Sequence, residues 1–402
     1  SLLDSVYTSK MREVSGKYPD DANVAVLFAE SLMNLHPWNL FSKDGTIQPW
    51  TSEIIAVLKH ALLIDPLNAG ANHFFIHAEE MSRNPGEALT SADLLRDLVP
   101  GAGHLVHMPS HTYIRIGRYH EGALTNLKAV LVDSLYTEAC NAQGAYPLAY
   151  YPHNYHFLAA CATLCGESRN AIMGANETRL HAHRNLLLEP AWATLQHYYS
   201  IPYYIQVKLG LWKDIQQSAE PEKQLKYPRV IWHYAQGMAA LSQDKTASAR
   251  RHLGEMKSIM QDTTIKHLTI WGINNLSDLC MIASKTLEGE IQASKKNYSK
   301  AVALLREAVA CEDVLNYNEP PDWFFSVRHN LGAVLIEAGN YQEATGVYNE
   351  DLKNFPENGW ALIGLVNAFE KLGEKDKVNE FKSRFKDAWK YADIKIASSR
   401  IL

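Results

Sequence analysis

The sequence has few cysteines and no long hydrophobic run. Five cysteines scattered over 402 residues are too few for a disulfide framework. We therefore expect a reducing compartment and a cytoplasmic protein. No apolar stretch approaches the roughly 20 residues that a membrane span needs, so no membrane partner is expected. The opening run SLLDSVYTSKMREV lacks the basic start and apolar core of a signal peptide.

Strong charge of one sign and the common catalytic motifs are also missing. The net charge is only -5 at pH 7 and no basic block occurs, which argues against a nucleic-acid partner. There is no P-loop, dinucleotide fingerprint, nucleophile elbow or CxxC. HEXXH is absent too, because His77 is followed by AEE. Any chemistry must therefore come from another pattern.

Histidine is concentrated in one part of the chain. Eleven of the 17 histidines lie between residues 73 and 197, and several recur at helical spacing. The sets are His73 with His77 and Glu80, His107 with His111, and His153 with His156. Residues i, i+3 and i+4 share one face of a helix. Each set therefore presents imidazoles side by side, as a chelating metal site needs.

The chain also repeats itself every 34 residues. Pro66 and Pro100 are separated by this distance, as are Gly339 and Gly373. Each proline follows an amphipathic run, and each glycine joins two apolar-periodic stretches. A similar turn signature recurs less strictly at Gly117, Gly166, Gly210 and around Asn297. This pattern predicts an all-α solenoid of helical hairpins.

With this period and these Gly, Ala and Pro positions, the chain resembles the tetratricopeptide repeat (TPR) family over nearly its whole length. The resemblance implies an all-α, right-handed solenoid of TPR-like helical hairpins. It also implies that positions 2, 5, 9 and 12 of each first helix line a concave groove. If Pro66 closes one repeat, the next begins near residue 69, and all three histidine sets fall on groove positions. His197 falls at position 2 of the following repeat and would extend the cluster.

Residues 15–215 also resemble a widespread group of bacterial TPR proteins. These proteins carry HPW, HxxxHxxE, GAGHLVHMPSH and YYPHNxHFL in this order. The matching segments here are 36–38, 73–80, 101–111 and 150–158. No reaction is assigned to that group, so the resemblance implies no activity. Its members usually extend further upstream than Ser1, which implies that a helical N-terminal portion precedes this chain.

The groove histidines predict a transition-metal site within residues 1–225, while 226–402 read as ordinary C-terminal TPR repeats. Neutral imidazole suits Zn, Cu and Fe, whereas Mg and Ca prefer oxygen ligands. We therefore expect one or two ions of Fe, Cu, Mn or Zn per chain. The predicted ligands are His73, His77, His107, His111, His153, His156 and Glu80. No residues for an organic cofactor are predicted.

Two residues are predicted to be catalytic. Glu80 is a candidate general base over a metal-bound water as well as a candidate ligand. Tyr155 would orient a substrate beside the ion. Glu79, one position away, is expected to point away from the histidine face into solvent. The insertions 36–50 and 136–152 adjoin the histidine region, where long loops often form a lid or wall.

Three functions stay open from the sequence. The first is a metal-dependent enzyme acting on a small molecule, with redox chemistry favoured and a zinc-dependent hydrolase as its variant. The second is a non-enzymatic TPR scaffold whose groove binds a peptide or protein, which suits residues 226–402. The third is a purely structural metal. It ranks lowest, because six histidines exceed the needs of one tetrahedral site.

Overall fold

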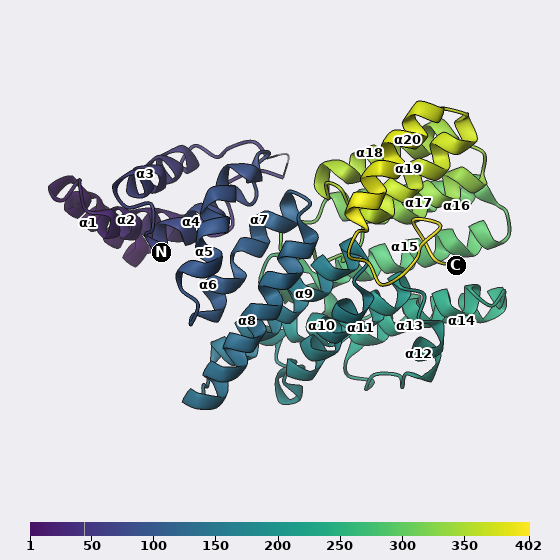
Figure 1. Cartoon of the computed structure of the whole chain (residues 1–402). Helices are drawn as coiled ribbons and strands as arrows, with labels where there is room; N and C mark the ends of the chain where they lie inside the picture. The colour runs from purple at the N-terminus through teal and green to yellow at the C-terminus, as the bar shows by residue number, and fades with distance from the viewer. Residues whose placement is uncertain (44) are drawn as a thin grey trace. The chain divides into compact units, whose positions relative to one another are not determined.

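The computed structural model describes residues 1–43 and 45–402, and helices make up nearly all of its regular structure. The chain divides into two compact units, Ser1–Ala142 and Gln143–Leu402, whose helices are labelled in Figure 1. The expected fold class, an all-α array of helical hairpins, is confirmed. Among the described residues, no helix combines the length and the apolar composition that crossing a bilayer requires.

The first unit is a succession of antiparallel helices. Its elements are α1 (Leu2–Lys17), α2 (Ala22–Leu35), α3 (Thr51–Ile64), α4 (Ala69–Glu79), the 3₁₀ helix η1 (Pro85–Ala88), α5 (Leu89–Leu98), α6 (Gly103–His107), α7 (Pro109–Arg115) and α8 (Tyr119–Cys140). Helices α3 and α5 end two residues before Pro66 and Pro100, as the repeat predicted. The helices of this unit pack their apolar faces around a core that includes Phe28, Leu58 and Ile76.

The second unit continues the pattern of hairpins. Its elements are the π-helix η2 (Tyr146–Tyr150), α9 (Tyr151–Cys165), α10 (Ser168–His181), the 3₁₀ helices η3 (Arg184–Leu186) and η4 (Pro190–Trp192), α11 (Thr194–Lys208), α12 (Trp212–Gln217), α13 (Lys226–Leu241), α14 (Thr246–Ile259), the 3₁₀ helix η5 (Thr263–His267), β1 (Thr269–Ile270), β2 (Asn274–Asn275), α15 (Leu276–Ser294), α16 (Tyr298–Asp313), α17 (Arg328–Glu337), α18 (Tyr341–Asn354), α19 (Gly359–Leu372) and α20 (Lys375–Ala388). The predicted turn glycines adopt left-handed backbone angles, with φ of 82° at Gly166 and 84° at Gly339.

The end of the second unit packs against its beginning. The indole nitrogen of Trp360 on α19 donates to the carbonyl of Thr163 on α9, at 2.9 Å. The carboxylate of Asp393 accepts from the backbone N–H of Ser168 at 2.7 Å, at the start of α10. At the turn between α9 and α10, Gly166 leaves room for the ring of Trp389. The last two repeats, which the sequence presents as ordinary hairpins, therefore close this unit.

The irregular segment after α20 lies on several helices of the second unit. Ser399 accepts a hydrogen bond from Lys208 of α11 through its carbonyl, at 3.0 Å. The carbonyl of Ala397 accepts from the Asn367 side chain of α19 at 2.8 Å. Arg400 pairs with Glu290 and Glu337. The predicted division at residue 225 concerns where the chemistry lies, and it stays a prediction.

Candidate metal centre

Helix α4 carries the first histidine set. The Asn68 side chain caps its N-terminus by accepting from the Ala71 N–H, so the helix begins where the repeat predicted. The ring centroids of His73 and His77, one turn apart, are 4.9 Å from each other. Nδ1 of His77 lies 3.3 Å from Oε1 of Glu80, at the C-terminal cap. The predicted common face of this helix is therefore present.

Two short helices, α6 and α7, carry the next histidines. His104 and His107 lie in α6, and His111 lies in the first turn of α7 after Pro109. His107 is the last residue of α6, and it lies two residues before α7 begins at Pro109. Met108 keeps right-handed helical angles between the two helices, so Pro109 interrupts the hydrogen bonding without changing the course of the chain.

The side chains from these three helices meet in two overlapping groups. One group contains His73, His77 and His104, and the other contains His77, Glu80 and His111. Within each group, one ligand atom from every residue lies within 4.8 Å of the others. His77 belongs to both. A histidine ring has two nitrogens on different edges, so one imidazole can serve two neighbouring positions.

His107 adjoins the second group with its tautomer fixed by a neighbour. The Asn126 side chain on α8 donates to the carbonyl of Gly122, which leaves its oxygen 2.7 Å from Nδ1 of His107. This oxygen accepts from Nδ1–H, so Nε2 of His107 carries the lone pair. That Nε2 lies 2.9 Å from Nε2 of His111. Holding the far nitrogen by a hydrogen bond is the usual arrangement for a ligand histidine.

Burial sets the protonation of this cluster. Burial lowers the pKa of His73 well below its ordinary value, and burial with the charges of His77 and His111 lowers that of His104 to about 3. Both rings are therefore neutral at pH 7, the form that binds metals. Nε2 of His73 is buried without a hydrogen-bond partner among the described residues. A buried polar atom without a partner costs free energy unless a ligand satisfies it.

The two neighbouring glutamates differ in their surroundings. Burial alone would raise the pKa of Glu80, but His111 and His77 lower it to about 2. Its Oε2 lies 2.7 Å from Nδ1 of His111. Glu79 was expected in solvent, and this is wrong, because only 5% of its surface is exposed. It lies in the last turn of α4, where burial raises its pKa.

The insertion 36–50 supplies a wall beside the cluster. The ring of Trp38 stands edge-on to His77, with centroids 6.1 Å apart. His36 stacks on Trp50 at 3.9 Å, which holds the two ends of the insertion together. The Trp50 indole also donates to the Asn39 carbonyl. The described part of the insertion therefore places the Trp38 ring beside His77.

The remaining predicted ligands, His153 and His156, lie on α9 of the second unit. His156 is buried, stacks on Phe324 at 4.9 Å and lies beside His197 at 5.5 Å between centroids. Burial lowers its pKa well below the ordinary value. His153 lies edge-on to Phe157 on the same helix. The role of both residues as ligands stays a prediction.

Tyr155, the other predicted catalytic residue, also lies on α9. Its ring stacks against His181 at 5.6 Å between centroids. Its hydroxyl lies 3.3 Å from the hydroxyl of Tyr151. The catalytic role of Tyr155 stays a prediction.

Sequence reasoning missed two residues of this cluster. His104 was not assigned, although its place one turn before His107 in GAGHLVHMPSH put it on the same side of a helix. Asn126 gave no signal, because its contact with His107 depends on how α6 packs against α8. The set of candidate ligands in the first unit is therefore larger than predicted by one imidazole.

Gly103 is expected to be essential for placing α6. A Cβ at this position would lie 1.8 Å from Oδ1 of the fully buried Asp133 on α8. Gly103→Ala should therefore lower the free energy of unfolding by about 1–3 kcal/mol, as overpacking does. Urea denaturation followed by circular dichroism would measure this change. Gly101→Ala is the control, because a Cβ added at this position would meet no neighbouring atom within 4 Å. Equal stabilities of the two variants would contradict the expectation.

The helices, left-handed turns and closing prolines define an all-α, TPR-like scaffold. No protein-family model and no curated protein sequence matches the chain. Similar solved structures include a human IFIT1 dimer with m7Gppp-AAAA, at 11% identity and a TM-score of 0.36, over 97% of this chain and 78% of that one.

Two further structures are similar to a comparable degree. Naa15/Naa10 bound to HypK-THB has 13% identity and a TM-score of 0.31, over 95% of this chain and 60% of that one. The P58(IPK) TPR domain has 11% identity and a TM-score of 0.25, over 91% and 92%. At these levels, what those proteins bind says nothing about this chain.

Proposed function

We propose that this protein is a metal-dependent enzyme built on a TPR-like scaffold, with its metal site among the histidines of the first unit. The observation that carries the proposal is the convergence of His73, His77, His104, His111 and Glu80 from three helices. Imidazoles with one carboxylate are a donor set for transition metals, and His73 and His104 are neutral at pH 7 because burial lowers their pKa. Nε2 of His73, buried without a partner, is the kind of atom that an ion would satisfy.

The two overlapping groups suggest two ion positions. His73 and His104 would hold the first, and Glu80 and His111 the second, with His107 beside it. His77 would serve either position, because its Nδ1 faces Glu80 and its other nitrogen remains for His73 and His104. This assignment agrees with the expectation of one or two ions per chain.

The donor set favours a redox metal over zinc. His77, His111 and Glu80 offer two imidazoles and one carboxylate, the set typical of non-haem iron sites, and imidazole also suits Cu. Both oxygens of Glu80 face imidazole nitrogens, so Glu80 is better placed as a ligand than as a hydrolase's general base.

The reaction proposed is oxidation or reduction of a small molecule beside the ion. Trp38 would form one wall of the substrate position, and burial of Glu80 and His111 would limit access of water. The peptide-binding alternative rested on the repeats after residue 225. Residues 397–400 already contact four helices of the second unit, through Lys208, Glu290, Glu337 and Asn367. These contacts weaken the peptide-binding alternative.

Metal analysis of the purified protein tests the proposal. We expect about one or two equivalents of Fe, Cu or Mn, retained in a His267→Ala control and lost in the double variant His77→Ala/His111→Ala. His267 is an exposed histidine of η5. Zinc alone would move the proposal to the hydrolase variant. Absence of any bound ion, with no uptake after reconstitution with each ion, would overturn it.

A further inference from the structure

The segment that follows α20 lies on the second unit in the way that a bound peptide would. This terminal segment, residues 394–402, contains no helix or strand. Among the described residues, none of its backbone groups shares a hydrogen bond with another backbone group. Side chains hold its carbonyls instead, as Asn367 holds that of Ala397 at 2.8 Å and Trp389 holds that of Ile394 at 2.9 Å. Release of the terminal segment would therefore break no helix or sheet.

Ser399 is the fully buried residue of the terminal segment. Its hydroxyl donates to the carbonyl of His329 at 2.7 Å and accepts from the hydroxyl of Tyr348 at 2.7 Å. Its own carbonyl accepts from Lys208 at 3.0 Å. Three helices, α11, α17 and α18, therefore satisfy every polar group that this side chain and its carbonyl present. Such a position selects a small residue with a hydroxyl group.

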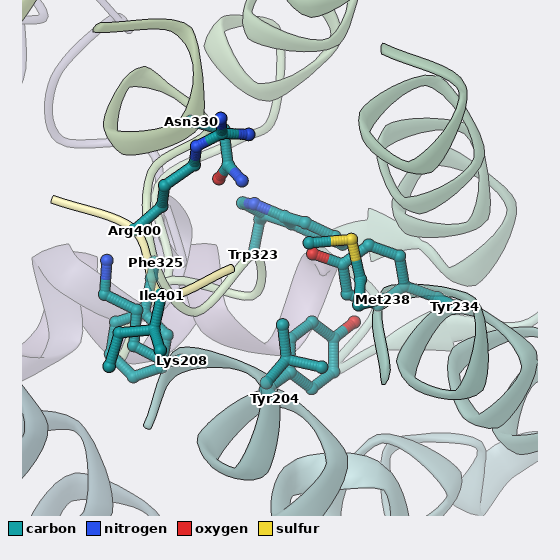
Figure 2. A pocket seen from close by; sticks show the side chains of 10 residues that line it. Tyr204, Lys208, Tyr234, Met238, Trp323, Phe325, Asn330, Arg400 and Ile401 are labelled. Atoms are coloured by element: carbon teal, nitrogen blue, oxygen red, sulfur yellow. The ribbon is translucent and has the colours of Figure 1, made fainter. Parts of the chain in front are cut away.

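Arg400 binds between two carboxylates on different helices. It pairs with Glu290 of α15 and with Glu337 of α17. Asn330 donates to Glu290 at 2.7 Å, and in Figure 2 the Arg400 side chain extends toward this amide. The Arg400 side chain is only 12% exposed, and that of Glu290 is fully buried. A buried ion pair adds little net stability over apolar packing, but it rejects a partner that lacks the cation.

Ile401 follows as an apolar contact and helps to close a cavity of about 40 Å³ (Figure 2). A Cβ at Gly210 would lie only 2.6 Å from Cγ2 of Ile401, so this side chain fits closely against α11 and its following turn. Apart from Lys208, Asn330 and Arg400, the rest of the lining is aromatic or aliphatic: Tyr204, Val207, Tyr234, Met238, Trp323 and Phe325. This surroundings therefore selects an aliphatic side chain after the arginine.

We propose that the terminal segment is an intramolecular ligand that blocks a peptide-binding site on the second unit. The site accepts a non-helical peptide of a partner protein with a serine, an arginine and an aliphatic residue in succession. The partner's arginine first meets Glu337, whose side chain is 43% exposed even while Arg400 is bound. Occupancy by the terminal segment keeps the site closed in the resting chain, and it also shows which peptide the site fits.

A partner protein fits this site better than a second copy of the chain. Every copy carries the same residues 399–401, but each segment is tethered beside its own site. Tethering gives an effective concentration in the millimolar range, so a second copy would have to leave its own site to bind. The site lies entirely within Gln143–Leu402 and shares no residue with the histidines of the proposed function. Peptide binding and metal content therefore fail or succeed separately.

Fluorescence anisotropy of a labelled synthetic peptide, IKIASSRIL, tests the proposal on the full chain. Wild type should bind this peptide weakly, because its own terminal segment competes. Arg400→Ala weakens that segment and should bind the peptide at least about tenfold more tightly, since loss of a buried ion pair exceeds a tenfold change in an equilibrium. Arg306→Ala is the control and should behave like wild type, because Arg306 pairs with Glu343 on the surface.

Changes on both sides of the contact test the selection of arginine. A peptide with alanine at the arginine position should bind the Arg400→Ala chain at least about tenfold more weakly, and so should the original peptide after Glu337→Gln is added to that chain. Arg400→Lys keeps the charge but loses the fork of donors, so it offers a milder test if Arg400→Ala does not fold. Circular dichroism would confirm the fold of each variant.

Trypsin cleavage after Lys395, an exposed residue of the terminal segment, gives a measurement that needs no peptide. Cleavage requires the segment to leave its site, so it should be faster in Arg400→Ala and Arg400→Lys than in wild type or Arg306→Ala. Equal peptide binding by wild type and the folded Arg400 variants would overturn the proposal. Binding that does not depend on the peptide's arginine would overturn it as well, and the terminal segment would then be a structural cap.

Discussion

Replacing Glu80 by glutamine should reduce the affinity for the metal about 100-fold. Glu80 contacts the nitrogens of His77 and His111 at 3.3 and 2.7 Å, so the change removes the negative charge beside two ligands. Loss of an outer partner of a ligand histidine typically costs 10- to 100-fold in metal affinity, and loss of Glu80, which is proposed as a ligand itself, should reach the upper end of this range. Competition with a chromophoric chelator would measure the affinity of the folded variant.

Glu79→Gln is the matched control, one residue away on the same helix. Glu79 is buried like Glu80, but burial raises its pKa and it belongs to neither histidine group. Removing a charge that burial disfavours should cost little stability and leave the metal affinity within about twofold. If both variants lost metal equally, the effect would come from distortion of α4 rather than from the carboxylate. That result would contradict the role of Glu80 as a ligand.

Much of the scaffold could be predicted because the same sequence signals for helix ends recur in successive repeats. Pro66, Pro100 and the turn glycines mark helix ends at a fixed period, and each of these positions carries a local backbone requirement. Closure of the second unit could not be predicted. It depends on contacts such as Trp360 with Thr163, which are almost 200 residues apart in the chain.

The histidine cluster also combines contacts that the sequence predicts with contacts that only the fold creates. His73, His77 and Glu80 share a face because of helical spacing alone, and the structure brings them together. The His107 tautomer depends on Asn126, and Asn126 is placed by packing of α8, so periodicity could not assign it. The error at Glu79 has a related cause. Helical spacing correctly placed Glu79 away from the histidine face, but the opposite face of α4 is buried too.

Replacing Asp351 by alanine should lower the free energy of unfolding of the second unit by about 3–5 kcal/mol. Asp351 is fully buried and accepts from Nε2 of His329 at 2.9 Å and from Asn358 at 3.0 Å. The other nitrogen of His329 accepts from Lys208 at 2.8 Å, so the imidazole connects a buried cation to a buried anion. Removing one member of such a pair leaves the other charge uncompensated in the interior.

Local measurement is needed, because the two units need not unfold together. Hydrogen exchange of the α17 and α18 amides in increasing urea would report the stability of this region. Glu350→Ala is the control, since Glu350 pairs with Lys353 on the surface, where ion pairs contribute about 0–1 kcal/mol. Equal protection in the two variants would contradict the prediction.

A double-mutant cycle separates loss of charge balance from loss of packing. Lys208→Met removes the cation and keeps an apolar side chain over the Trp360 ring, which Lys208 contacts at 4.0 Å from the centroid. Because the double variant Lys208→Met/Asp351→Ala leaves no unbalanced charge, it should be about 1–3 kcal/mol more stable than the sum of the single changes predicts. Strict additivity would mean that Asp351 acts through its hydrogen bonds to His329 and Asn358 alone. In that case Lys208 would be held in the interior by His329, Ser399 and Trp360 without a compensating anion.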